Sequence, residues 1–279
     1  MNNLLRTLLF SILLAAPLCL SSQTPTEHSW GLWSSVSAEK KLAKGLNTEL
    51  EIESRLRDNF KNIDKWSASV ALSYRLYRNS AKTINIKTDL GYKYIDEYNP
   101  EKMTLKDIYY DINGNSHQEY NLDHKYNIAK HRLYTSLNAS LSVGRIKVTL
   151  RERYQYTYND SIQVMEDKYR FDESIGTNGA MVKKKSEMEW KGEKNIHLLR
   201  SRVGLSYDIP KCKINPYCYI ELFNSINNHL ALDRARYTIG GEYTYHKRHN
   251  FKLYYLYNSF IKDNDPNFSV IGISYNYEF

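Results

Sequence analysis

Charged side chains recur at every second position along several stretches of the sequence, and they are the first candidates for chemistry. Between residues 46 and 57, for example, one alternate set is apolar or small and the other carries Asn, Glu and Arg. If such charged sets share one interior, they must pair or stay hydrated, because an isolated buried charge is very costly. The residues that we expect in this interior are Glu49, Glu51, Glu53, Arg55, Arg57, Arg75, Arg151, Arg153, Arg200, Arg202, Glu221, Arg234, Arg236 and Glu242.

This charged set has two interpretations. Interlocked Arg and Glu side chains could form a network that fills and rigidifies the interior. Alternatively, the excess of arginine could line a narrow polar pore that favours anionic solutes. The size of a barrel does not decide between them, because roughly eight strands give a filled interior, roughly sixteen give an open channel, and twelve lies between.

Catalysis needs a nucleophile and a base within hydrogen-bonding reach, with a third group that orients the base. His131 and His197 lie near predicted strand ends, but neither sits in a motif like those of barrel phospholipases or deacylases, and His246 and His249 fall in a turn at the other end. We therefore expect no catalytic residue, and a lipid-modifying enzyme is the competing function. No phosphate loop, paired-Cys site or zinc-like histidine spacing appears, so we expect no cofactor and no metal.

Two surface clusters and two cysteines remain. Lys183, Lys184 and Lys185 could contact lipopolysaccharide phosphates or simply keep a loop soluble. Acidic and amide side chains that could hold a cation do not have the spacing of a calcium loop; they are Asn159, Asp160, Asp167, Asp172 and Glu173. Cys212 and Cys218 would lie about 20 Å apart on one extended strand, so we expect free thiols unless a tight turn separates them.

Strands are the elements that would position these residues. The 279 residues include 25 Tyr, carry a net charge of +8 and are 42% hydrophobic, with a mean hydropathy of -0.62. The alternation has a period of two and extends over about 10 to 13 residues in each stretch, longer than ordinary strands and close to what a tilted strand needs to cross a bilayer. Tyrosines tend to end the apolar rows. We therefore predict a closed, antiparallel transmembrane β-barrel, with a soluble periplasmic β-barrel binding protein as the alternative.

Counting the strands raises a difficulty. Clear runs begin near Trp30, Leu46, Trp66, Thr83, Lys130, Ile146, Ile196, Ile214, Leu232, Phe251 and Phe268, which makes eleven, whereas bacterial single-chain barrels have an even number. An alternating run at residues 107–112 supplies a twelfth strand, which places both termini in the periplasm and leaves residues 113–127 and 159–195 as outer loops. Ten strands, with residues 30–42 outside the wall, is the second choice. Glu152 fits badly, because it falls on the lipid side and requires a bulge or an interfacial position.

The N-terminus predicts export. Residues 1–23 have the basic start, apolar run and small polar end of a signal peptide, so the barrel domain is expected to span residues 24–279. A lipoprotein signal at Cys19 and a buried N-terminal helix are the alternatives. An exported barrel also makes nucleic acid an improbable partner.

The C-terminus and several short motifs carry a family resemblance. Tyr275, Tyr277 and Phe279 look like the terminal signal that the barrel-assembly machinery reads. The chain resembles an uncharacterised family of Bacteroidota outer-membrane proteins, domain of unknown function 2490, over nearly the whole mature sequence. The resemblance rests on Trp33, Glu53, Arg55, Arg200, Arg202, Gly204, Leu205, Tyr207, Pro216, Tyr217, Glu221, Phe223, Arg234, Arg236, Gly240 and Tyr243.

What the resemblance implies is an outer-membrane barrel, with no established activity. We expect a monomer in contact with outer-membrane lipid and lipopolysaccharide.

Overall fold

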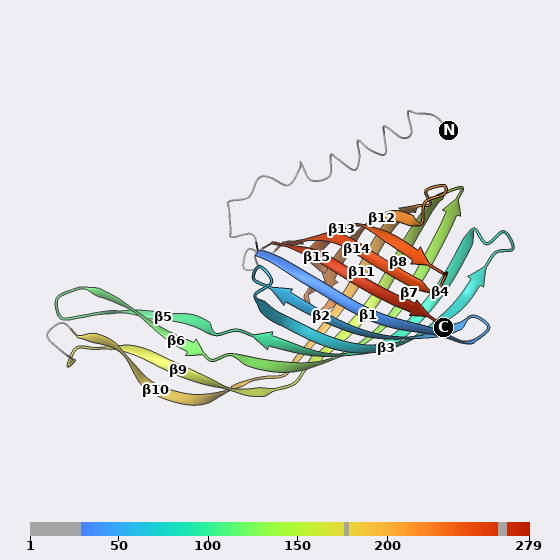
Figure 1. Ribbon diagram of the computed structural model, residues 1–279. Helices are drawn as coiled ribbons and strands as arrows, with labels where there is room; N and C mark the ends of the chain where they lie inside the picture. Colours follow the sequence, from blue (N-terminus) through green and yellow to red (C-terminus); the bar gives the residue numbers. More distant parts are fainter. Residues whose placement is uncertain (1–28, 176–178, 262–266) are drawn as a thin grey trace.

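Eleven strands close into a barrel, and four more form a separate sheet that projects from one end of it (Figure 1). The computed structural model describes residues 29–175, 179–261 and 267–279. Around the barrel the order is β1-β15-β14-β13-β12-β11-β8-β7-β4-β3-β2. The strands of the wall are β1 (Ser29–Ala43), β2 (Leu46–Arg57), β3 (Asn62–Arg78), β4 (Ile84–Asn99), β7 (Tyr126–Val143), β8 (Ile146–Asn159), β11 (Lys194–Tyr207), β12 (Ile214–Ser225), β13 (Ala231–Tyr245), β14 (His249–Phe260) and β15 (Phe268–Glu278).

The barrel closes through a parallel pair, which corrects two predictions. Every neighbouring pair in the wall is antiparallel except β1 and β15, which run parallel from Ser29 opposite Phe268 to Glu39 opposite Glu278. An odd number of alternating strands can close only in this way. The wall therefore has eleven strands rather than twelve or ten, and Ser29 and Phe279 lie at opposite ends of the barrel instead of at the same end.

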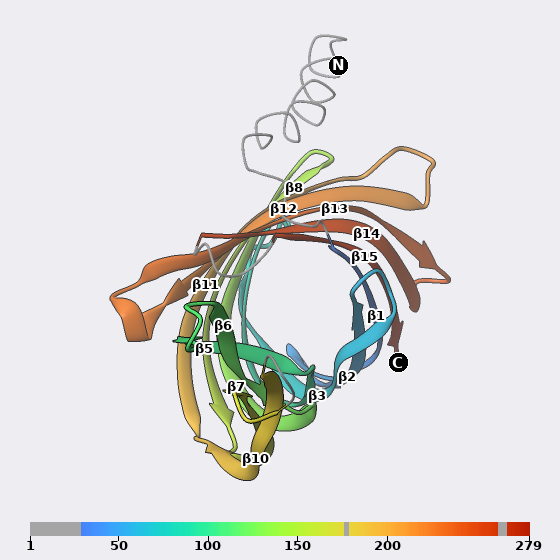
Figure 2. The ribbon, with the colours of Figure 1, turned by 90° about the vertical axis from the view of Figure 1, so that its left-hand side faces the viewer.

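The expected twelfth strand belongs to the projecting sheet. This sheet has the order β10-β9-β6-β5, and Figure 2 looks along the barrel from the end that carries it. Residues 107–112 overlap β5 rather than the wall, and the two segments expected to be outer loops contain the whole of the other three strands. Their bounds are β5 (Lys102–Tyr110), β6 (Ser116–Asp123), β9 (Ile162–Asp172) and β10 (Ala180–Lys191).

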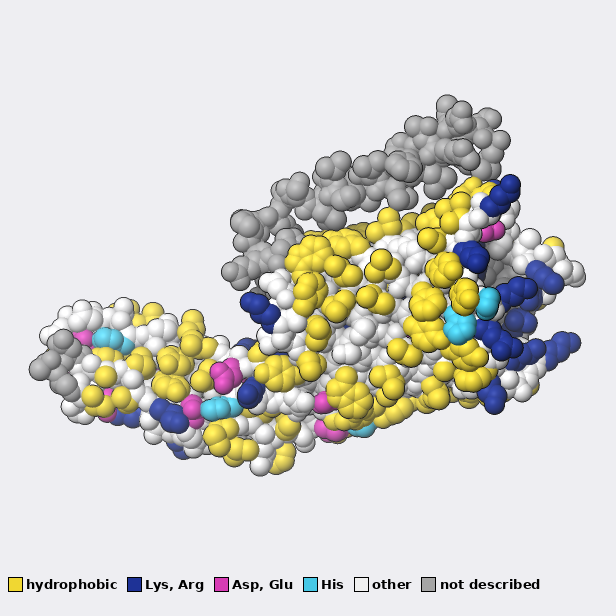
Figure 3. Space-filling model, viewed as in Figure 1, with side chains coloured by type: hydrophobic (Ala, Val, Ile, Leu, Met, Phe, Trp, Pro, Cys, Tyr) yellow, Lys and Arg dark blue, Asp and Glu magenta, His cyan; other side chains and the backbone are white. Residues whose placement is uncertain are grey.

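The outer face of the wall is apolar. Because side chains alternate along a strand, one row of each strand points away from the barrel, and these rows expose large aliphatic side chains across the wall (Figure 3). An exposed apolar surface of this extent is typical of a face that contacts lipid or another protein. Examples are Val36, Leu50, Ile52, Leu72, Leu90, Leu137, Leu150, Val203, Ile220, Leu253 and Ile273.

Aromatic side chains flank this apolar surface at both ends. At the sheet end Trp66 packs against Tyr94, with ring centroids 5.6 Å apart. At the opposite end Phe251 packs against Tyr275, with centroids 5.0 Å apart. Two such girdles are the arrangement expected of a barrel with its rings at the two membrane interfaces.

Glu152 lies on this outer face without a bulge. The pairing of β8 with β7 and β11 is regular on both sides of it, and the Ser201 hydroxyl donates a hydrogen bond to its carboxylate over 2.7 Å. Of the two expected accommodations, a bulge or an interfacial position, the bulge is therefore absent, and a neighbouring hydroxyl hydrogen-bonds the carboxylate.

Among the described residues, no helix has the length and apolar character needed to cross a membrane. The expected signal peptide, residues 1–23, lies outside the described part of the chain.

Candidate functional site: the arginine-lined lumen

The barrel encloses a cavity of about 330 Å³ with an unusually charged lining. Seven arginines and one lysine line it, against four glutamates, which leaves an excess of four positive charges. Ten of the fourteen charged residues expected in the interior lie on this cavity. They are Glu49, Glu51, Glu53, Arg55, Arg151, Arg153, Arg200, Arg202, Glu221 and Arg236.

Glu221 is the centre of the charge network. Its side chain on β12 is almost fully buried, with 1% exposure. One carboxylate oxygen forms an ion pair with Arg151. The other accepts from Arg200 at 2.9 Å and lies 3.5 Å from Arg236. One carboxylate therefore compensates three guanidinium groups from three different strands, which ties that side of the wall together.

A second group of ion pairs lies across the lumen on β2 and β4. The Nε atom of Arg55 is 2.5 Å from Glu53, and Lys93 donates to Glu51 at 2.8 Å. Trp33 connects this group to the first, because the Arg55 guanidinium lies 3.7 Å from its ring centroid and that of Arg236 lies 4.9 Å away. The indole also packs with Leu256 and Val270 in a small apolar cluster inside the barrel.

Three more arginine contacts involve Phe223, which is 3% exposed and whose ring centroid lies 4.9 Å from the guanidinium of Arg236. Its ring centroid lies 4.6 Å from the guanidinium of Arg200 and 4.1 Å from that of Arg234. The Phe223 ring holds these cationic side chains in place without supplying negative charge.

Inward tyrosines lie flat across glycines on the neighbouring strand. A Cβ atom at Gly272 would come within 1.9 Å of the Tyr254 ring, and one at Gly91 within 2.3 Å of the Tyr134 ring. Glycine at these two positions therefore allows large rings to fold against the wall rather than cross the lumen.

Four of the expected interior residues do not line the cavity. Arg57 forms ion pairs with Asp58 and Asp64, and Glu242 pairs with Lys252 at 3.4 Å. Arg234 lies over Phe223, and the Arg75 backbone N–H donates to the Gly45 carbonyl. These residues are on the expected strands but nearer the ends, where the cavity does not reach.

The lumen also contains charged residues that the sequence-based set omitted. Lys93 and Arg132 both line the cavity. Each occupies the polar face of an alternating stretch, at residues 84–94 and 130–143. The alternation itself therefore carries the signal for both residues, because every polar row of the wall strands faces the same interior.

Comparison with known proteins places the chain in a family. The family described as "Protein of unknown function (DUF2490)" matches residues 30–269. The chain belongs to this family. A comparison with curated proteins finds no match. Among solved structures, the crystal structure of the β domain of the Bordetella autotransporter Brka is similar at 13% identity and a TM-score of 0.42, covering 84% of this chain and 82% of that one.

Each of the two rim histidines is hydrogen-bonded to a tyrosine hydroxyl. Nδ1 of His131 lies 2.7 Å from the Tyr92 hydroxyl, and Nδ1 of His197 lies 2.8 Å from the Tyr154 hydroxyl. Within the described ranges, neither imidazole has a serine as a hydrogen-bond partner.

The basic stretch of the projecting sheet is paired with acids. Lys183, Lys184 and Lys185 form ion pairs with Asp167, Asp172 and Glu187, respectively. Asp167 also accepts hydrogen bonds from Ser186, at 2.5 Å, and from His124. The Ser186 hydroxyl, followed by His124, lowers the pKa of the Asp167 carboxyl to about 2.

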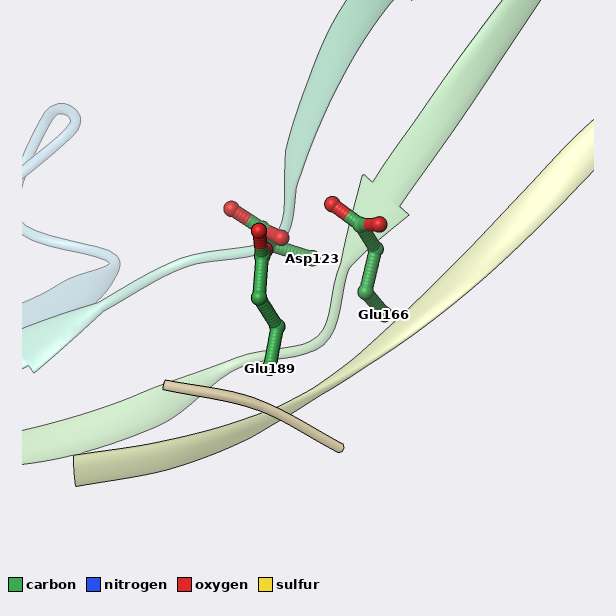
Figure 4. A group of neighbouring side chains, drawn as sticks. All are labelled: Asp123, Glu166 and Glu189. Atoms are coloured by element: carbon green, nitrogen blue, oxygen red, sulfur yellow. The ribbon is translucent and has the colours of Figure 1, made fainter. Parts of the chain in front are cut away.

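Three carboxylates converge where this sheet meets the barrel (Figure 4). Asp123, Glu166 and Glu189 have ligand atoms within 4.8 Å of one another. Lys191 already occupies this cluster, because its ammonium lies 3.0 Å from Asp123 and 2.8 Å from Glu189, and Asn121 donates to Glu166 at 2.8 Å. The arrangement is that of a sheet-stabilising ion-pair cluster.

The C-terminal aromatics lie at the end opposite the projecting sheet. Tyr277 meets Phe279 edge to face with centroids 4.7 Å apart, and Phe279 is 69% exposed. Cys212 and Cys218 are both free thiols, as expected.

Proposed function

We propose that the protein is an outer-membrane barrel that serves as a narrow passive passage favouring small anions. The observation that carries this proposal is the lumen, where eight cationic side chains face four carboxylates around a cavity of about 330 Å³. Water occupies about 30 Å³ per molecule in the liquid, so this space suits small hydrated ions and excludes large solutes. Rings of cationic side chains are the usual basis of anion preference in pores.

The membrane placement is supported by the outer surface. Exposed aliphatic rows between two aromatic girdles match the surface of a transmembrane barrel, and closure leaves no unpaired strand edge in the wall. The short connections at residues 44–45, 144–145 and 246–248 would face the periplasm. The projecting sheet would then lie outside the cell, near lipopolysaccharide, as in barrels with short periplasmic turns and long outer loops.

A heat-modifiability experiment tests the architecture first. The mature protein, refolded in detergent, should migrate differently on an SDS gel when it is not boiled. Identical mobility of boiled and unboiled samples would contradict a stable membrane barrel.

Planar-bilayer recording then tests the passage. Refolded protein should produce discrete conductance steps, and a potassium chloride gradient should give a reversal potential whose sign indicates chloride preference. Lys185→Gln changes one charge on the projecting sheet, away from the lumen. It serves as the control and should conduct like the wild type. A silent bilayer, or cation preference, would contradict the proposal.

A further inference from the structure

Four arginines occupy neighbouring positions on two adjacent strands of the lumen. In the register of β8 and β11, Arg151 lies opposite Arg202 and Arg153 lies opposite Arg200. All four line the cavity. Directly opposite side chains on paired strands have Cβ atoms about 5 Å apart, and like charges there destabilise a sheet. This arginine quartet therefore requires negative charge nearby.

The protein supplies that charge to only half of the quartet. Glu221 pairs with Arg151 and Arg200, which occupy one diagonal. Within the described residues, Arg153 and Arg202, on the other diagonal, have no carboxylate partner. Nε of Arg153 donates to the Ser136 hydroxyl at 2.8 Å.

Aromatic rings hold the two unpaired guanidinium groups. Arg153 lies 4.2 Å from the ring centroid of Tyr134, and Arg202 lies 4.8 Å from that of Tyr219. Within the described residues, both groups are therefore positioned on the cavity wall without a carboxylate at ion-pair distance.

The quartet also contains buried donors that an oxyanion could accept from. Nε of Arg151 and Nε of Arg200 are buried and have no hydrogen-bond acceptor. A guanidinium group presents its N–H donors in a planar fork that fits two oxygens of one oxyanion. Diagonal positions on paired strands are about 7 to 8 Å apart, and somewhat less at Cβ, a separation that long arginine side chains close around a polyatomic anion more readily than around a halide.

We infer that the arginine quartet binds a divalent oxyanion of the phosphate class, with Arg153 and Arg202 as its principal ligands. This inference deepens the proposed anion passage, because the lumen would deliver the anion to the quartet. The shared chemistry is a phosphate group, either free or as the monoester of a small solute.

Calorimetric titration of the refolded mature protein tests the inference. Sodium phosphate and glucose 6-phosphate serve as two separate probes, with sodium chloride at equal ionic strength as the reference. We expect saturable binding of phosphate. Binding of both probes would define a phosphomonoester site, and binding of phosphate alone would define a site for the free ion.

The double variant Arg153→Gln/Arg202→Gln should weaken phosphate binding by about tenfold or more, because a hydrogen bond to a charged group contributes more than a neutral one. The double variant Arg57→Gln/Arg75→Gln removes the same charge away from the cavity and should bind like the wild type. Heat-modifiability confirms that each variant is folded. Equal losses in both double variants, or phosphate heats that match chloride, would overturn the site.

Bilayer recording separates the two proposals. A barrel that conducts chloride but does not bind phosphate overturns the oxyanion site and leaves the passage intact. A barrel that binds phosphate but shows no conductance overturns the passage and leaves the oxyanion site intact.

Discussion

The guanidinium of Arg55 lies 3.7 Å from the centroid of the Trp33 indole, directly across the β1–β2 pair. Trp33 is 7% exposed and also contacts Leu256 and Val270 inside the barrel. The indole thus joins the charged part of the lumen to its small apolar cluster. It is the bulkiest side chain of that cluster, so it is the natural candidate for the narrowest point.

Replacing Trp33 should widen the passage. Trp33→Leu keeps an apolar contact with Leu256 and Val270 but removes the ring and its cation–π contacts, at a cost of about 2 kcal/mol for a desolvated pair. We expect a larger unit conductance in planar bilayers. Trp66→Leu, at the outer girdle, is the control and should leave unit conductance unchanged. A conductance of Trp33→Leu equal to that of the wild type would exclude Trp33 as the constriction.

Removing the central carboxylate should destabilise the barrel. Glu221→Gln leaves three guanidinium groups without their shared partner, and breaking a buried pair in this way costs roughly 3 to 5 kcal/mol. Urea unfolding from micelles should show a clearly lower midpoint. Glu242→Gln, whose half-exposed side chain pairs with Lys252, should cost less than about 1 kcal/mol. Similar midpoints for both variants would show that Glu221 is not the centre of the network.

Ser186→Ala should raise the pKa of Asp167. The hydroxyl is the largest cause of the lowered pKa of about 2, so its removal should move the value toward that of an ordinary aspartate. Because this pKa is lowered in the folded sheet, the stabilisation is complete above about pH 4 and is lost as pH falls toward 2. The Ser186→Ala variant should lose this stabilisation at a higher pH than the wild type.

A pH titration of the labelled carboxyl carbon measures this effect. Ser174→Ala is a reciprocal control, because Lys184, followed by Ser174, lowers the pKa of Asp172 to about 2. It should shift Asp172 and leave Asp167 unchanged. An unchanged pKa of Asp167 in Ser186→Ala would disprove the assigned cause.

The two thiols should report their different surroundings. Cys212 is exposed in the connection between β11 and β12, whereas Cys218 lies within β12 and is half-buried. In lipid vesicles a charged maleimide should modify Cys212 much faster than Cys218, because lipid would cover the outer wall. Single variants Cys212→Ser and Cys218→Ser allow each rate to be measured by mass spectrometry. Equal rates in vesicles would argue against a lipid-covered β12.

The strand count shows that the alternation of the sequence was a better guide to the wall than the rule that bacterial barrels have an even number of strands. All eleven stretches identified from alternation correspond to the eleven strands of the wall, beginning with β1 at Ser29 and ending with β15 at Phe268. The even-number rule and the alternation of residues 107–112 together predict a twelfth wall strand, which the described residues do not form. The alternation of residues 107–112 was real, but periodicity reports a strand and not the sheet to which the strand belongs.

The sequence by itself located the eleven alternating stretches that form the wall, because a period of two marks the residues of a strand that share one face. It also indicated an interior rich in arginine. Only the tertiary structure decided that β1 and β15 pair in parallel and that β5, β6, β9 and β10 form a second sheet. It also decided that Glu221 pairs with three arginines, while Arg153 and Arg202 have no carboxylate of the described residues at ion-pair distance. Those outcomes depend on which strands become neighbours and in what register, and such long-range pairing has no signature within a single strand.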